Sequence, residues 1–111
     1  MRVMIHSCGD VSEIMGELAD IGVDVFNPFQ PEVMDIVEIK RIHGGRMSFF
    51  GGMSTQRTLP SSTPGQVREK TRWLCDMIGN GGGYVFSPAH DIPGDVPAEN
   101  MLAMIEELHK Q

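Results

Sequence analysis

Short apolar runs alternate along the chain with stretches in which apolar residues recur every three or four positions. The apolar runs predict strands at residues 2–7, 23–27, 47–51 and 84–87. The spaced apolar residues predict helices over residues 11–21 and 32–43, from Thr63 to Ile78, and from Pro97 onward. Strands that alternate with amphipathic helices are typical of α/β folds with a parallel sheet and right-handed crossovers.

Capping and turn residues define the ends of these elements. Asp10 is a candidate N-cap of the first helix, and Thr63 with Pro64 at the first helical position opens the third. Pro28 is expected to stop the second strand, and residues 52–56 are expected to form the loop that leaves the third strand.

Helical spacing also predicts which side chains face inward. The expected stripes are Val11, Ile14, Met15, Leu18 and Ile21 in the first helix, Val67, Thr71, Leu74, Cys75 and Ile78 in the third, and Met101, Met104, Ile105 and Leu108 in the last.

The strand–helix units have the length of those in a (β/α) barrel. A full barrel contains eight such units over about 250 residues, whereas this chain has 111 residues. We therefore expect an α/β fold of four units, with residues 1–111 forming a single partial domain.

Composition narrows the classes of function. The net charge of −6 argues against a nucleic-acid surface. No apolar run approaches the roughly 20 residues that span a bilayer, and the first residues lack the layout of a signal peptide. With only two cysteines, which do not make a disulfide framework, these features predict a cytoplasmic protein that does not contact membranes.

Candidate chemistry lies just beyond the predicted strand ends. His6 and Cys8 are two residues apart, so on a strand they point to the same side, and both are zinc-type ligands. The other strand ends are followed by candidate substrate residues and a third imidazole: Asn27, Gln30, Gly52, Met53 and His90. Because the carboxyl ends of barrel strands form the catalytic face, we expect these residues to converge.

Structural roles compete with several of these assignments. His6 and Cys8 could be a packed pair at a strand end, and Cys75 lies on a helix stripe as a buried thiol. His43 fits a partner of the helix dipole, and His109 is expected to be exposed. The run of glycines at 81–83 lacks the lysine and serine of a phosphate loop, so it is interpreted as a turn.

Five segments spread along the chain resemble the carboxy-terminal half of the uroporphyrinogen decarboxylase family, a family of (β/α)8 barrels. They are His6-Ser7-Cys8-Gly9-Asp10, Gly22-Val23-Asp24 with Asn27-Pro28 and Gln30-Pro31-Glu32, Phe50-Gly51-Gly52-Met53-Ser54-Thr55-Gln56, Gly81-Gly82-Gly83-Tyr84, and Asp95-Val96-Pro97-Ala98-Glu99-Asn100. The resemblance implies that the four units form half of such a barrel.

The His-x-Cys element is similar to the branch of cobalamin-dependent methyltransferases in that family. The resemblance implies a zinc ion as cofactor, held by His6, Cys8 and a distant third ligand, and methyl transfer between a corrinoid and a thiol. His90 stands in the place of the family's usual distant cysteine, and a Cys-His-His set still suits zinc. Tetrapyrrole decarboxylation without a metal is the alternative enzyme activity.

The resemblance covers only half a barrel, which implies a fragment or a chain that needs a partner. Expected partners are a second copy, a separate amino-terminal half, or a corrinoid protein. A non-catalytic half-barrel whose open sheet edges invite association is the second class of function, and an open four-stranded module with an unrelated ligand site is the third.

Overall fold

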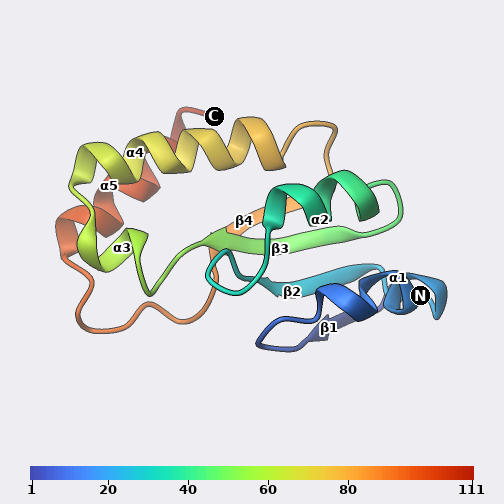
Figure 1. The fold of residues 1–111 in the computed structure, drawn as a ribbon. Coiled ribbons are helices and arrows are strands. Elements are labelled where there is room, and N and C mark those ends of the chain that lie inside the picture. Colours follow the sequence, from blue (N-terminus) through green and yellow to red (C-terminus); the bar gives the residue numbers. More distant parts are fainter.

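Four parallel strands, adjacent in the order in which they occur in the sequence, form the centre of the computed structural model, which describes residues 1–111 (Figure 1). The strands are β1 (Met4–His6), β2 (Val25–Phe29), β3 (Ser48–Met53) and β4 (Tyr84–Pro88). Each neighbouring pair is parallel. The predicted parallel α/β architecture is therefore confirmed.

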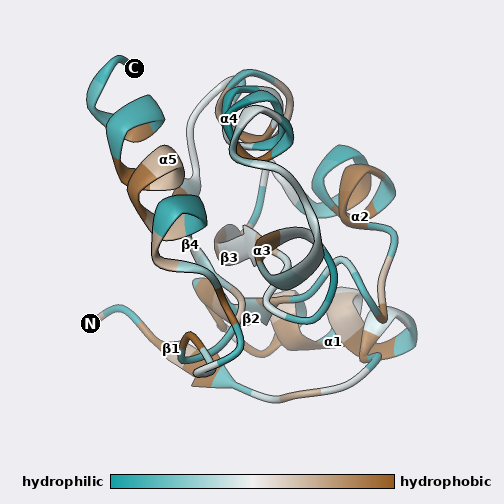
Figure 2. Cartoon of the chain, turned by 90° about the vertical axis from the view of Figure 1, so that its left-hand side faces the viewer, coloured by the Kyte–Doolittle hydropathy of each residue, from teal (hydrophilic) through white to brown (hydrophobic).

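The helices follow one another in an arc around one side of this sheet (Figure 2). They are a 3₁₀ turn (Ser12–Ile14), α1 (Met15–Asp20), α2 (Ile36–His43), α3 (Thr58–Ser61), α4 (Pro64–Trp73) with a π-helical continuation (Leu74–Ile78), and α5 (Ala98–His109). Figure 2 looks at the carboxyl ends of the strands, where α3 lies in front. The opposite side of the sheet carries no helix.

The two faces of the sheet differ in burial because alternate strand residues point to opposite sides. Phe26 and Phe49 are adjacent in register, face the helices and are fully buried. Phe29 stacks on Phe49 with ring centroids 4.5 Å apart. On the open face, Met4 remains 60% exposed and Val85 48% exposed. The core thus lies between the sheet and the helices, and the other face is uncovered.

Strand β2 runs through Pro28, so the expectation that this proline stops the strand is wrong. The register between β2 and β3 shifts between Phe26 and Phe29, and a proline is tolerated at such a bulge because no ladder hydrogen bond from its nitrogen is needed there. Gly51 lies opposite Phe29 with φ +134°, and a Cβ at Gly51 would lie 2.7 Å from the Phe29 nitrogen. The bulge therefore requires glycine at position 51.

The first two helices begin later than predicted. The segment from Ser12 starts as a 3₁₀ turn, and α2 begins at Ile36 rather than at Glu32. Asp35 caps α2 by accepting a hydrogen bond from the Glu38 nitrogen at 3.1 Å. In the first segment Met15 is buried, but Ile14 and Ile21 are exposed.

Helix α4 begins where the sequence predicts. Thr63 and Gln66 form a reciprocal capping box, and Pro64 occupies the first turn. The inward stripe is confirmed at Val67, Thr71, Leu74 and Ile78, which are fully buried, whereas Cys75, predicted with them, is only partly buried. The short helix α3 falls after the predicted exit loop and was not predicted, because a four-residue helix that contains Pro60 shows no periodicity.

The inward face of α5 is rotated from the predicted one. Met104 is buried as expected, but Ile105 is 44% exposed, while the polar Asn100 and Glu107 are buried. The Asn100 amide donates to the carbonyls of Leu59 and Ser62, each at 2.8 Å. These polar contacts turn the helix away from the face that hydrophobicity alone indicates.

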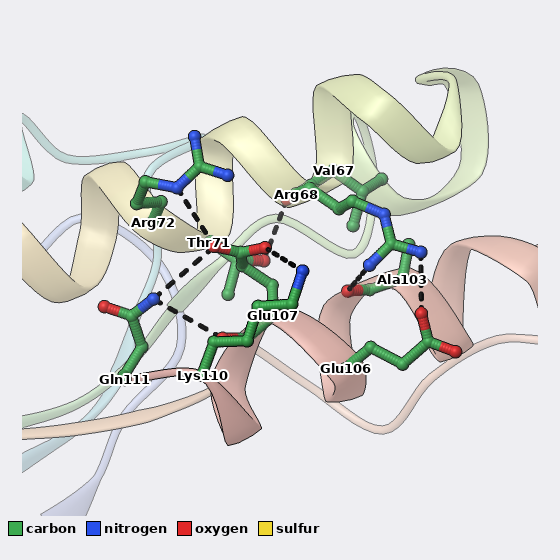
Figure 3. Close-up of polar contacts among 9 residues, drawn as sticks. All are labelled: Val67, Arg68, Thr71, Arg72, Ala103, Glu106, Glu107, Lys110 and Gln111. Carbon is green, nitrogen blue, oxygen red and sulfur yellow. Dashed lines mark hydrogen bonds and ion pairs between the residues drawn. The ribbon is translucent and has the colours of Figure 1, made fainter.

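Ion pairs join α4 to α5 (Figure 3). Arg72 donates to Glu107 at 3.0 Å, and Arg68 donates to Glu106 at 2.7 Å. The hydrogen bond from Arg72 lowers the pKa of the Glu107 carboxyl. The buried carboxylate therefore stays ionised where it attaches the last helix to its neighbour.

No helix in the structure combines the length and apolar character that crossing a membrane requires.

Candidate functional site

The three predicted metal ligands lie at the carboxyl ends of the two edge strands. His6 is the last residue of β1, and Cys8 follows two positions later. His90 follows the end of β4 by two positions. Although β2 and β3 separate these two strands in the sheet, the curvature of the sheet brings their ends together.

Cys8 lies between the two imidazoles. Its sulfur is 3.6 Å from Nε2 of His6 and 3.8 Å from Nε2 of His90. The two rings have centroids 6.3 Å apart and are inclined at 69°. The structure thus brings together a sulfur and two nitrogens that the sequence separates by more than 80 positions.

These separations fit the donor spacing of a zinc site. With Zn–S of about 2.3 Å, Zn–N of about 2.0–2.1 Å and tetrahedral angles, the sulfur and each nitrogen lie about 3.6 Å apart. The observed sulfur–nitrogen distances are 3.6 and 3.8 Å. The three groups do not form a metal-binding cluster as they stand, and Nε2 of His90 is engaged by Gln30. The donor types suit zinc, whereas their arrangement would have to change for all three to bind one ion.

Gln30 holds His90 in its present position. Its amide nitrogen donates to His90 Nε2 at 2.8 Å, and its amide oxygen accepts from the Gly9 nitrogen at 3.0 Å. These two contacts fix which end of the amide faces the imidazole. The Nε2 lone pair of His90 is therefore directed at Gln30, and a metal would replace this hydrogen bond.

His6 is oriented by Asn27, its register partner on β2. The distance between His6 Nδ1 and Asn27 Oδ1 is 2.5 Å, and Asn27 Nδ2 donates to the Phe50 carbonyl at 3.1 Å. Both ends of the Asn27 amide are thus engaged by the protein, and its contact with a substrate stays a prediction.

A hollow of about 420 Å³ opens beside His6 and His90. Its wall consists of His6, Asn27, Phe50, Ser87, Pro88, Ala89, His90 and Asp91. Phe50 and Ser87 were not among the predicted site residues. The signal that could have indicated them is strand alternation, since both belong to the open face of the sheet that also carries Asn27.

Gly52 and Met53, predicted as substrate contacts, do not line this hollow. Met53 is fully buried in the hydrophobic core. A Cβ at Gly52 would meet the Tyr84 hydroxyl, and that hydroxyl donates to the Gly51 carbonyl at 2.7 Å. These two positions shape the end of β3 rather than the hollow.

Two aspartates lie near the site, and neither is hydrogen-bonded to His6 or His90. Asp10 accepts hydrogen bonds from Ser12, and these lower the pKa of its carboxyl. Asp91 lies on the wall of the hollow. The imidazole partners that the structure provides are the amides of Asn27 and Gln30.

The remaining histidines and the second cysteine lie elsewhere. His43 ends α2, and His109 is exposed at the end of α5. Cys75 is partly buried, and burial raises the pKa of its thiol. Lys70 covers the face of the Trp73 ring at 3.9 Å from its centroid, which gives this tryptophan a packing role.

Comparison with known proteins identifies relatives of two kinds. Uroporphyrinogen decarboxylase of Cronobacter sakazakii is 32% identical over 76 residues, which cover 68% of this chain and 21% of the relative. Methylcobamide:CoM methyltransferase MtaA of Methanosarcina barkeri is 28% identical over 102 residues, which cover 92% of this chain and 29% of the relative. The chain therefore spans less than a third of the length of either protein.

A solved structure, titled a methyltransferase from Methanosarcina mazei, has the same fold. It superimposes with a TM-score of 0.75 at 21% identity and covers 98% of this chain and 31% of its own. This match supports the prediction that the four units are half of a (β/α)8 barrel. The sequence model of the uroporphyrinogen decarboxylase (URO-D) family matches residues 1–111. Because that match spans the whole chain, the protein belongs to the uroporphyrinogen decarboxylase family.

Proposed function

We propose that this chain forms the carboxy-terminal half of a URO-D-like methyltransferase, which moves a methyl group between a corrinoid and a thiol at a zinc site. The observation that carries the proposal is the position of the Cys8 sulfur, 3.6 Å from His6 Nε2 and 3.8 Å from His90 Nε2. The corrinoid is expected on a partner protein. A methyltransferase relative that aligns with 92% of this chain supports the same activity.

The chain's own residues would hold and orient the participants. When bound, zinc lowers the pKa of a coordinated thiol, so that the substrate sulfur is deprotonated at neutral pH. Cys8, His6 and His90 provide three ligands, and three protein ligands leave the fourth position open for a substrate. Ser87 and Asp91 line the hollow beside that position and offer a hydroxyl and a carboxylate to a substrate.

Tetrapyrrole decarboxylation is the competing activity within the family, and several bacterial relatives are named as uroporphyrinogen decarboxylases. The two possibilities differ in their need for a metal. The proximity of a thiol to two imidazole nitrogens favours the methyltransferase, because this donor set suits zinc and decarboxylation has no use for it.

Metal analysis tests this proposal directly. The chain would be purified without chelator and its zinc measured by mass spectrometry, for the natural sequence and for the Cys8→Ser and Cys75→Ser variants. We expect about one zinc per chain in the natural protein and in Cys75→Ser, and loss of zinc in Cys8→Ser. Circular dichroism controls for folding. Natural protein that binds no zinc, or a Cys8→Ser variant that retains it, contradicts the proposal.

Association with another half-barrel is a second candidate function. Strands β1 and β4 each pair on one side only, and exposed strand edges recruit further strands. The open face presents Met4 and Val85, and α5 exposes Leu102 and Ile105. We propose that an amino-terminal half of the same family, or a second copy, covers these surfaces.

Light scattering coupled to size exclusion tests this association. A dimer, or a complex formed with a co-expressed amino-terminal half from a longer relative, is the expected result. A stable monomer that forms no complex with the added amino-terminal half contradicts the proposed association. The zinc measurement and the mass measurement are independent, so one proposal can fail while the other stands.

A further inference from the structure

We infer that Asn27 is a positioning residue that fixes the tautomer of His6 and so prepares its Nε2 for a metal. The effect on metal binding rests on the proposed zinc site, whereas the contact between Asn27 and His6 does not. The Asn27 amide is part-buried and has a partner at each end.

The orientation of this amide follows from its two contacts. The Phe50 carbonyl lies 3.1 Å from Asn27 Nδ2 and can only accept a hydrogen bond. If the amide were flipped, its oxygen would face that carbonyl oxygen, and neither could donate. Nδ2 therefore faces Phe50, which leaves Oδ1 facing the imidazole of His6.

The orientation of the amide determines where His6 carries its proton. Asn27 Oδ1 lies 2.5 Å from His6 Nδ1, and an amide oxygen has no proton to donate. Nδ1 must therefore be the protonated nitrogen. In the neutral imidazole the lone pair is then on Nε2, the nitrogen that lies 3.6 Å from the Cys8 sulfur.

The strand register explains why residue 27 can do this. His6 and Asn27 are direct partners in the β1–β2 ladder, so their side chains leave the same face of the sheet. Asn27 follows Phe26, which pairs with Phe49 on β3, and lies in the irregular stretch between Phe26 and Phe29, where its amide reaches the Phe50 carbonyl. The β-sheet thus places the Phe50 carbonyl, the Asn27 amide and the His6 imidazole in one hydrogen-bonded series without any ligand.

The test uses three variants and two measurements. Asn27→Leu removes the acceptor, Asn27→Asp retains it, and Ser87→Ala is the control, because the Ser87 hydroxyl lines the same hollow but donates to the Pro88 carbonyl at 2.9 Å. Nitrogen-15 chemical shifts of His6 report its tautomer in metal-free protein, and competition with a chelator reports zinc affinity. Circular dichroism shows that each variant folds.

We expect protonated Nδ1 in the natural protein and in Asn27→Asp. Asn27→Leu should shift His6 toward the other tautomer and weaken zinc binding by about 10- to 100-fold. Ser87→Ala should change neither. Unchanged His6 shifts in Asn27→Leu overturn the inference, as does unchanged zinc affinity. If the natural protein binds no zinc but the tautomer shifts as expected, the proposed zinc function fails and the positioning by Asn27 stands.

Discussion

Gln30 donates a hydrogen bond to Nε2 of His90 across 2.8 Å. Gln30 is 4% exposed and also accepts from the Gly9 nitrogen. One buried side chain therefore joins the loop that carries Cys8 to the loop that carries His90, and the site is connected before any metal is present.

This contact predicts energetic coupling between Gln30 and His90. In a double-mutant cycle with Gln30→Leu and His90→Ala, measured by urea unfolding in chelator, we expect a coupling of about 1 kcal/mol, since a hydrogen bond contributes about 0.5–1.5 kcal/mol. Additive effects within about 0.3 kcal/mol would show that the two residues do not interact in solution.

Gly51 predicts a strong dependence of stability on one Cβ atom. Its φ of +134° and the Phe29 nitrogen at 2.7 Å from a built Cβ mean that Gly51→Ala combines backbone strain with a clash. We expect a loss of about 1–3 kcal/mol in the free energy of unfolding. Gly45→Ala is the matched control, because nothing lies within 4 Å of its Cβ, and it should change stability by less than about 0.5 kcal/mol. If both substitutions lower the free energy of unfolding equally, the bulge does not require glycine at position 51.

Glu107 predicts a loss of stability in acid. Arg72 lowers the pKa of this carboxyl in the folded protein, so ionised Glu107 stabilises the fold above the pKa of the unfolded chain. That contribution disappears as the pH falls below the ordinary glutamate range, near about 4.3, toward the folded-state pKa. The Glu107→Gln variant should therefore have a lower free energy of unfolding than the natural protein at pH 7. This difference should shrink as the pH falls, as measured by urea unfolding at several pH values.

A glutamate on the surface of α4 provides the comparison. Glu69 is exposed, and Glu69→Gln should leave the pH profile nearly unchanged. A Glu107→Gln profile parallel to that of the natural protein from pH 7 to pH 3 would rule out the assigned role.

We expect Cys8 and Cys75 to react with a disulfide reagent at different rates. Burial raises the pKa of Cys75, and Asp76 raises it further, so little thiolate forms there at neutral pH. Cys8 is exposed. We expect a disulfide reagent to modify one thiol rapidly and one slowly, with Cys75→Ser retaining the rapid phase and Cys8→Ser the slow one. If zinc binds at Cys8, it should suppress only the rapid phase.

Much of the fold was predictable because each helix that packs on the sheet shows its own periodicity. The α4 stripe and the Thr63–Pro64 start of that helix depend on local sequence, and both occur where expected. The errors arise where tertiary contacts override local preference. Pro28 sits in a strand because a bulge accommodates it, and the face of α5 is set by the partners of Asn100 and Glu107.

The candidate site was partly predictable for a similar reason. His6 and Cys8 share a strand end, which spacing alone indicates. The position of His90 after a strand end predicts that it lies on the same edge of the sheet, and the family resemblance implies its role as third ligand. How close it comes to His6 and Cys8 depends on how far the sheet curves, which the sequence does not display. The engagement of Asn27 with His6 depends on the register between two strands, which a single sequence does not display.

The position of His6 on β1 has a thermodynamic consequence. One side of β1 has no neighbouring strand, so the sheet holds His6 and Cys8, the proposed ligands, from one side only. A polypeptide that docked along that vacant side would steady both donors at once, and loaded donors would in return favour docking by an equal free energy. Metal binding at the proposed site and docking of a polypeptide on the free side of β1 would then be one linked equilibrium.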